Sequence, residues 1–457
     1  MHNIRPNAAP RVRMYRQGLG DCFLVLLPRE NQRCFSILID CGVLLGTKEA
    51  QAKMLRVARD IAQVTEKHLD VVVATHEHWD HLSGFLQARE VFDELTIGEV
   101  WLAWTEDPAD TLAKHLRQQR QQAMRALYVV ASRLAELDPE AASLRRSPLA
   151  FFKAKGSMST SEAMEYLVHH PKKPRVRYLT PGGATIELPV EGAARAFVLG
   201  PPRDEQLIHR SNPTKSGKEV YALAQGMALF AAAGAESSFQ EDTDDRFHAF
   251  ERLHRRRSDE AAFFQSEYFR SANEWRRIDT DWLGVADQLA LALDNHTNNT
   301  SLAFALELEP RGRVLLFPGD AQVGNWLSWH DHRWPSPSRR RRWIDAADLL
   351  KRTVLYKVGH HGSHNATLRE QGLERMVHQD LAALVPVDKT MAERKRWNMP
   401  FPALYERLQQ LARGRVLRAD EDIPQRPEGV SAAEWKRFVD RVGANDLYYD
   451  YTIPSRE

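Results

Sequence analysis

The stretch THEHWDH, residues 75–81, follows directly on the apolar and largely β-branched run LDVVVA at 69–74. A run of that kind predicts a buried strand, so the cluster is expected on the turn at its carboxyl end. On such a turn His76 and His78 can point to one side, while Asp80 and His81 reach a second point nearby. Two divalent ions about 3.5–4 Å apart need a ligand set divided in this way. The alternative is a chance cluster of surface histidines, and the density of the pattern favours a two-metal site.

Two later segments repeat this order of an apolar strand followed by polar side chains. VLLFPGD at 314–320 ends on Asp320, and VLYKVGHH at 354–361 ends on His360 and His361. Three strands that deliver polar groups at their carboxyl ends predict a layered α/β fold with its chemistry along one edge. Asp320 could instead be a residue that caps a turn, but its place in this series favours a ligand.

Composition limits the class of protein. The chain has 457 residues, 43% of them hydrophobic and 27% charged, and a formal net charge of only +2. A value so close to zero implies no overall attraction to nucleic acid, so any basic surface must be local. The sequence shows no run of eighteen apolar residues and no apolar signal segment near its start, so we expect a cytoplasmic protein with no membrane contact.

The three cysteines, Cys22, Cys34 and Cys41, form neither an even set nor a Cys-x-x-Cys pair. We therefore expect reduced, buried thiols rather than a disulfide framework or a zinc–thiolate site.

Two long stretches between the motifs are not needed by a core of this kind. Both are expected to be mainly helical insertions, and the first is basic. The expected parts are residues 1–103 as the first half of the core, 104–178 as the helical basic insertion, 179–202 as core strands, 203–290 as the second helical insertion, 291–418 as the second half of the core with metal ligands, and 419–457 as a C-terminal helix and strand.

Basic residues cluster in three runs, at 171–177, 254–257 and 339–342. Charge runs are usually solvated faces. A local patch that holds an anionic substrate is the alternative, provided that the fold brings these runs to the metal site.

The motif HEHWDH resembles the His-x-His-x-Asp-His signature of the metallo-β-lactamase superfamily. Asp320 and the segment His360-His361-Gly362-Ser363 follow in the order typical of that superfamily. The segments GLGDCFLVLLP at 18–28, LIDCG at 38–42 and NNTSLAFAL at 298–306 resemble one subgroup, the hydrolase domain of the competence protein ComEC and related hydrolases. The resemblance implies an α/β fold of the αββα sandwich type, interrupted by the two insertions.

The resemblance also implies a ligand set. His76 and His78 would bind the first metal, Asp80 and His81 the second, and Asp320 would bridge both. His360 or His361 completes the second site; we favour His361 as the ligand and His360 as the group that contacts substrate or transfers a proton. Further roles fall to Asp40, which supports the ligands from behind, to Asp80, which also orients the attacking hydroxide, and to Asn298, Asn299, Ser301 and Ser363, which would contact substrate.

The third ligand of the first metal stays open. A histidine about two dozen residues before the bridging Asp is typical of the superfamily, and His296 stands there. The ComEC-like subgroup instead tends to have Asn and Ser, as Asn298, Asn299 and Ser301 are here. The ions are expected to be zinc, with manganese as the alternative if His296 is not a ligand.

These features predict a hydrolase that uses a hydroxide held between two metals. A phosphodiesterase or nuclease acting on DNA, RNA or a nucleotide is the favoured function. The alternatives are hydrolysis of a small ester, lactone or phosphocholine-type substrate, and a non-catalytic metal-binding regulatory protein.

Overall fold

The computed structural model describes residues 9–29, 32–137, 159–211, 281–336 and 342–454, together with positions 266 and 270. The chain divides into two compact units. Unit 1 consists of Met1–Leu116, Leu149–Lys215 and Asn295–Glu457, and unit 2 of Arg117–Pro148 and Ser216–Asp294. Both large sheets and every metal ligand expected from the sequence belong to unit 1.

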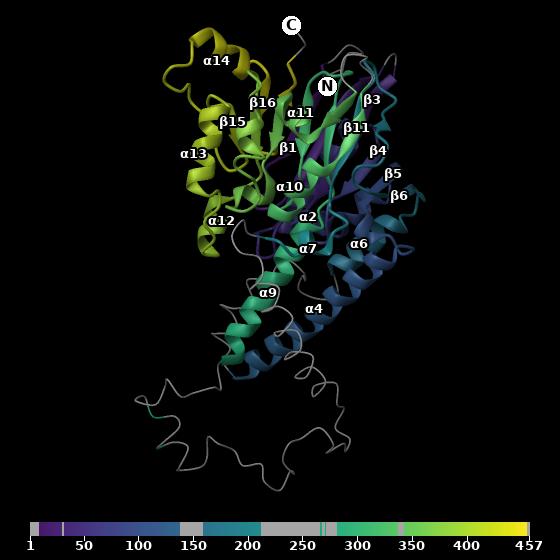
Figure 1. Cartoon of the computed structure of the whole chain (residues 1–457), viewed down its shortest axis with the longest axis vertical. Coiled ribbons are helices and arrows are strands. Elements are labelled where there is room, and N and C mark those ends of the chain that lie inside the picture. Colours follow the sequence, from purple (N-terminus) through teal and green to yellow (C-terminus); the bar gives the residue numbers. More distant parts are fainter. Residues whose placement is uncertain are drawn as a thin grey trace. The chain divides into compact units, whose positions relative to one another are not determined.

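An eight-stranded sheet carries the first half of the motifs. Its order is β16 (Val442–Ala444), β17 (Tyr448–Thr452), β1 (Arg11–Tyr15), β2 (Cys22–Arg29), β3 (Gln32–Cys41), β4 (His68–Ala74), β5 (Thr96–Ala103) and β6 (Arg175–Leu179). The strands β3 to β6 are parallel, so their carboxyl ends lie at one edge of the sheet (Figure 1). The ligand cluster follows β4 at that edge.

A seven-stranded sheet carries the second half. Its order is β15 (Val416–Arg418), β14 (Ala382–Val385), β13 (Thr353–Lys357), β10 (Val314–Phe317), β9 (Ala303–Glu307), β8 (Arg195–Gly200) and β7 (Ile186–Glu187). Here β10, β13, β14 and β15 are parallel, which places Asp320 and the 360–361 pair at the same edge of this sheet. A short hairpin of β11 (Arg333–Pro335) and β12 (Trp343–Asp345) forms separately.

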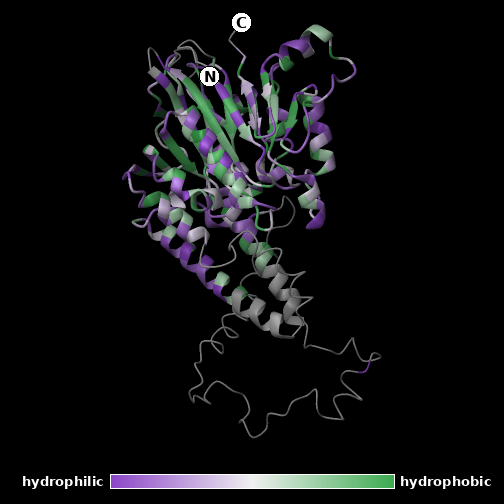
Figure 2. Cartoon of the chain, turned by 180° about the vertical axis from the view of Figure 1, so that it is seen from behind, coloured by the Kyte–Doolittle hydropathy of each residue, from purple (hydrophilic) through white to green (hydrophobic). Residues whose placement is uncertain are grey.

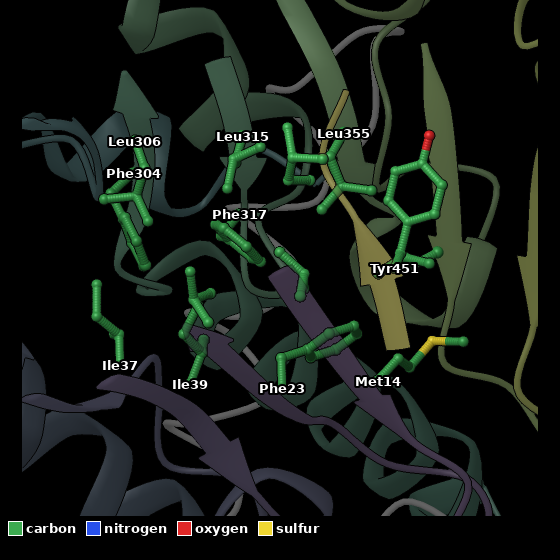
Figure 3. Packing of buried hydrophobic residues seen from close by; sticks show 14 of the residues in the cluster. Met14, Phe23, Ile37, Ile39, Phe304, Leu306, Leu315, Phe317, Leu355 and Tyr451 are labelled. Carbon is green, nitrogen blue, oxygen red and sulfur yellow. The ribbon is translucent and has the colours of Figure 1, made fainter. Parts of the chain in front are cut away.

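Side chains from both sheets share one hydrophobic core. Phe304 of β9 stacks on Phe317 of β10 with ring centroids 5.5 Å apart. Phe23 of β2 meets Phe317 edge-on at 6.4 Å, and Trp101 of β5 meets Phe304 at the same distance. Figure 3 shows Phe23 and Phe317 facing one another across this core. The aromatic contacts therefore join the sheet that carries the 76–81 cluster to the sheet that carries Asp320.

A second hydrophobic cluster lies between the eight-stranded sheet and four helices. These are α1 (Ala50–Val64), α2 (Trp79–Gln87), α3 (Arg89–Phe92) and α6 (Thr160–Val168). Their apolar faces explain the burial: in α1 the residues Met54, Val57 and Ile61 recur at three-to-four spacing and are buried. Figure 2 shows hydrophobic residues along the strands and polar residues on much of the helical surface. The α/β class expected from the sequence is confirmed.

The remaining helices are α4 (Thr111–Leu137), α7 (Glu205–Ile208), α9 (Asp281–Asn299), α10 (Val323–Ser328), α11 (Ala346–Lys351), α12 (Lys389–Arg394), α13 (Pro402–Leu411) and α14 (Ala432–Val439). In the described part of the chain, no helix has the length and apolarity needed to cross a membrane.

The two expected insertions relate to these elements in different ways. The range 104–178 contains the long helix α4, and its later elements α6 and most of β6 belong to unit 1. Most of 203–290 lies outside the described residues. The C-terminal segment 419–457 contributes β16 and β17, and β17 pairs with β1 and so extends the first sheet.

We predict that Phe304→Ala lowers the free energy of unfolding by about 3–5 kcal/mol, because it leaves a cavity between two aromatic neighbours. Denaturant titration of the full chain measures the loss. The exposed residue Val377 supplies a control, since Val377→Ala should change stability by less than about 0.5 kcal/mol. A loss below about 1 kcal/mol for Phe304→Ala would mean that these ring contacts contribute little to joining the sheets.

Candidate metal centre

The loop between β4 and α2 is fixed by the carboxylate of Asp40, near the end of β3. Asp40 accepts hydrogen bonds from the Thr75 amide at 2.8 Å and the Thr75 hydroxyl at 2.7 Å. It also accepts one from Nδ1 of His81 at 2.8 Å. Asp40 is fully buried and has a left-handed backbone, with φ of 54°. Its expected role behind the ligands agrees with these contacts.

Nδ1 of His81 donates to Asp40, so the neutral ring has a lone pair on Nε2. That nitrogen lies 3.1 Å from Oδ2 of Asp320. The same argument holds for His361, whose Nδ1 donates to the carbonyl of Pro386 at 2.7 Å and whose Nε2 lies 2.9 Å from Oδ2 of Asp80. A lone pair and a carboxylate oxygen at such distances repel one another unless a proton or a metal cation lies between them.

These four residues fit a divalent cation. One ligand atom each from Asp80, His81, Asp320 and His361 lies within 4.8 Å of all the others, and all four residues are buried. Among the described residues, Oδ1 of Asp80 has no hydrogen-bond partner although it is buried. A mixed imidazole and carboxylate set suits zinc, and manganese is compatible with it.

The pKa values reflect the same arrangement. Burial alone would lower the pKa of His81, but Asp320, Asp21 and Asp40 raise it well above its ordinary value. Burial also opposes the charged form of His361, yet Asp80 and Asp320 raise its pKa. These carboxylates therefore favour the protonated form of both rings, and a bound metal cation would take the place of each proton.

His76 and His78 form the other half of the cluster. Nε2 of His76 and Nδ1 of His78 lie 3.0 Å apart, close enough to share one ion. Nδ1 of His76 lies 3.0 Å from the Thr75 hydroxyl, which gives its own proton to Asp40 and so accepts the His76 N–H. Burial lowers the pKa of His76 well below its ordinary value and that of His78 to about 3. Both rings are thus neutral, as metal ligation requires.

His296 does not join this cluster among the described residues. Its ring lies against His209, with Nε2 of His296 3.1 Å from Nδ1 of His209 and ring centroids 4.1 Å apart. Burial, and then the neighbouring His209, lowers the pKa of His296 well below its ordinary value. His296 thus forms a buried pair with His209, and the ligand role considered for it stays a prediction.

Ser301 lies within the centre and Asn299 beside it. The Ser301 hydroxyl is 3.2 Å from Nδ1 of His76 and accepts the Asp320 amide at 3.0 Å. Asn299 instead donates to the carbonyls of Ile208 and Arg210 and accepts the Gln322 amide. The side-chain amide of Asn299 thus joins neighbouring chain segments, and the substrate contact expected of Asn299 stays a prediction.

Asn298 precedes this pair in the chain, and its side chain is buried. The Asn298 carbonyl accepts the Ser301 amide at 3.0 Å, which makes a turn before β9. The substrate contact expected of Asn298 stays a prediction.

His360 is held differently from His361. Its amide donates to Oδ1 of Asp320 at 3.0 Å, and its Nδ1 lies 3.0 Å from the Ser363 hydroxyl. Ser363 donates to Oδ1 of Asn365, so its oxygen accepts the His360 Nδ1–H and leaves a lone pair on Nε2. Burial lowers the pKa of His360 to about 4. The ring is therefore neutral at neutral pH, and Ser363 orients it.

Both histidines of this pair have left-handed backbone conformations, with φ of 44° at His360 and 52° at His361. Such conformations are unfavourable for residues with a side chain and gather at functional sites. The turn after β13 thus presents two adjacent rings in different directions.

Two residues of the centre were missed by sequence reasoning. Lys357, in the last position of β13, donates to the Gly319 carbonyl at 2.8 Å and to Oδ1 of Asp320 at 3.1 Å, and it forms an ion pair with Asp21. Lys357 could have been noticed, because a charged residue within the apolar run VLYKVGHH indicates a buried group with a specific partner. Asp21 stood inside the segment GLGDCF, where nothing in the spacing marked it.

The described basic run, 171–177, does not line the centre. The first residue of β6, Arg175, pairs in register with Glu99, and β6 runs parallel to β5. The run therefore begins at the amino end of the parallel strands, opposite the edge that carries the ligands. Arg175 and Arg177 also form ion pairs with Glu99. The run at 254–257 and residues 339–341 lie outside the described residues.

The model of the metallo-beta-lactamase superfamily matches residues 18–118. The matched range holds Asp21, Asp40 and the cluster at 76–81, and it ends before Asp320 and His361. It names the superfamily and no subgroup. No curated protein matches the chain. The superfamily generally consists of hydrolases that hold divalent metals, and the buried His/Asp cluster of this chain could hold them as well.

We predict that zinc binding releases protons. Asp320, Asp21 and Asp40 raise the pKa of His81, and Asp80 and Asp320 raise that of His361, so a proton on either ring competes with the ion and is displaced when the ion binds. Affinity should therefore rise with pH, by about tenfold per unit for each proton released. Calorimetric titration of zinc in buffers with different ionisation enthalpies measures the release. Binding without proton exchange would contradict the arrangement.

We also predict that His296→Ala leaves the metal content of the purified chain unchanged, because His296 packs on His209. Elemental analysis gives the number of ions per chain. His361→Ala is the matched variant and should lower the content by removing a ligand atom. A loss in His296→Ala equal to that in His361→Ala would restore His296 to the ligand set.

Proposed function

We propose that this protein is a hydrolase that uses two divalent ions, zinc or manganese, to cleave a phosphodiester in a nucleotide or nucleic acid. The fold proposed with it is the αββα sandwich with two insertions. The observation that carries the metal chemistry is the pair of close nitrogen–oxygen contacts, His361 to Asp80 at 2.9 Å and His81 to Asp320 at 3.1 Å. Each contact needs a proton or a metal cation between its two atoms, and four buried ligand atoms within 4.8 Å of one another favour the metal.

When bound, two such ions supply a Lewis acid and lower the pKa of water. The chain's own groups then bind and orient. Oδ1 of Asp80 is buried beside the ligands without a described partner, so it can accept a hydrogen bond from the attacking water and orient it. Nε2 of His360 presents a lone pair, because Ser363 holds the proton on Nδ1. It can hold a proton that passes between water and the leaving group.

The proposed substrate class is supported by where three segments meet. GLGDCF supplies Asp21, LIDCG supplies Asp40, and NNTS supplies Ser301, and all three residues contact members of the cluster. These are the segments that resemble the ComEC-like subgroup, in which phosphodiesters are the expected substrates. The net charge of +2 and the position of the 171–177 run favour a small contact with phosphate over a long duplex footprint.

The experiment is hydrolysis of bis-p-nitrophenyl phosphate by the full chain with zinc or manganese. We expect turnover that chelator abolishes. Asp80→Asn should reduce it by more than tenfold, which corresponds to about 1.4 kcal/mol of transition-state stabilisation. Asp440→Asn, at an exposed carboxylate paired with Lys436, is the matched control and should leave turnover unchanged.

Other outcomes would contradict parts of the proposal. Activity on a lactone or carboxylic ester, with none on phosphodiesters, would keep the hydrolase and change its substrate. Stoichiometric metal with no hydrolysis of either class would favour the non-catalytic reading.

A further inference from the structure

Lys357 is a buried cation at the end of a hydrophobic strand, and its side chain is 2% exposed. The ammonium group has three N–H donors. Three acceptors surround it, and they are the Gly319 carbonyl, Oδ1 of Asp320 and the carboxylate of Asp21. No donor is left for substrate or solvent. All three N–H groups of Lys357 therefore interact with other groups of the protein.

Asp21 is held equally firmly. Its amide donates to the Asp80 carbonyl at 3.0 Å, and its own carbonyl accepts the Gly42 amide at 2.9 Å. Its side chain is 2% exposed, so its charge needs the ammonium group of Lys357. The group Asp21, Asp40 and His81 has ligand-like spacing. Oδ2 of Asp21 pairs with Lys357, and Asp40 accepts from His81 and Thr75, while Oδ1 of Asp21 is buried without a hydrogen-bond partner among the described residues.

The two oxygens of Asp320 consequently face different partners. Oδ1 accepts from Lys357 at 3.1 Å and from the His360 amide at 3.0 Å. Among the described residues, Oδ2 has a hydrogen-bond contact only with Nε2 of His81, and a proton or a metal cation must lie between these two atoms. A carboxylate can bind metal through one oxygen or through both, and here the protein occupies one of them.

We propose that Lys357, held by Asp21, is a positioning residue that reserves Oδ1 of Asp320 for the protein, so that only Oδ2 is offered to metal. Asp320 would then hold metal through Oδ2, while Lys357 and the His360 amide keep Oδ1 hydrogen-bonded. This inference rests on the metal centre of the proposed function and is independent of the substrate.

The first test is a crystal structure of the full wild-type chain loaded with zinc. We expect Oδ2 of Asp320 at a bonding distance of about 2.0–2.2 Å from zinc and Oδ1 still on Lys357. A structure in which Oδ1 binds zinc would overturn the inference and leave the metal centre standing. A chain that binds no zinc would overturn both.

The second test separates positioning from a merely structural ion pair. Lys357→Met alone would leave Asp21 buried without its partner, so the variant is Lys357→Met combined with Asp21→Asn, which removes both charges. We expect the freed Oδ1 to change zinc affinity by threefold or more in calorimetry. A change below threefold would mean that the pair only stabilises the fold, and would overturn the inference.

A matched control removes another buried ion pair. Arg195 and Glu307 are 2.6 Å apart, Glu307 also pairs with Arg352, and it is the last residue of β9, at the far end of that strand from Ser301. Arg195→Met combined with Glu307→Gln should leave zinc affinity within threefold of the wild type. An equal change in this control would assign the effect to general loss of a buried pair and count against Lys357.

Discussion

Three hydrogen bonds to the carboxylate of Asp40 hold the ligand loop in place. They fix the Thr75 backbone, the Thr75 hydroxyl and the His81 ring, so the end of β3 determines where the loop after β4 runs. The Thr75 carbonyl in turn accepts the Leu302 amide at 2.8 Å, which attaches this loop to the start of β9 in the other sheet. The two halves of the centre thus meet through a short chain of buried contacts, and each needs the other for its geometry.

Much of this arrangement could be predicted from the sequence. Parallel strands end at one edge, so apolar runs that finish on THEHWDH, on Asp320 and on His360-His361 had to bring those groups together once the sheets faced a common core. An apolar strand followed directly by polar residues is a pattern of neighbouring residues, and such patterns can be recognised from the sequence alone. His361 was preferred over His360 as the ligand from the sequence; Nε2 of His361 lies 2.9 Å from Oδ2 of Asp80, and its ligand role stays a prediction.

The parts that could not be predicted depend on pairing between distant segments. His296 stands at a suitable sequence distance from Asp320, but spacing does not reveal that His209 lies beside it. Asn299 looked available for substrate because its side-chain partners lie up to ninety-one residues away. Lys357 and Asp21 are separated by most of the chain, so neither showed its partner. The run at 171–177 was recognised as basic, but strand direction, not composition, decides which end of a sheet it occupies.

The left-handed backbone at Asp40, His360 and His361 has a consequence for how this protein would respond to selection. Glycine or asparagine adopts such a conformation more readily than aspartate or histidine. Laboratory evolution for thermal tolerance alone should therefore drift toward small residues at 360 and 361, whereas Asp40 is retained because its three hydrogen bonds hold the ligand loop. Such lineages would become more robust while losing the side chains that hold the centre together. Persistence of histidine at 360 and 361 under that pressure would report that function, and not folding, maintains them.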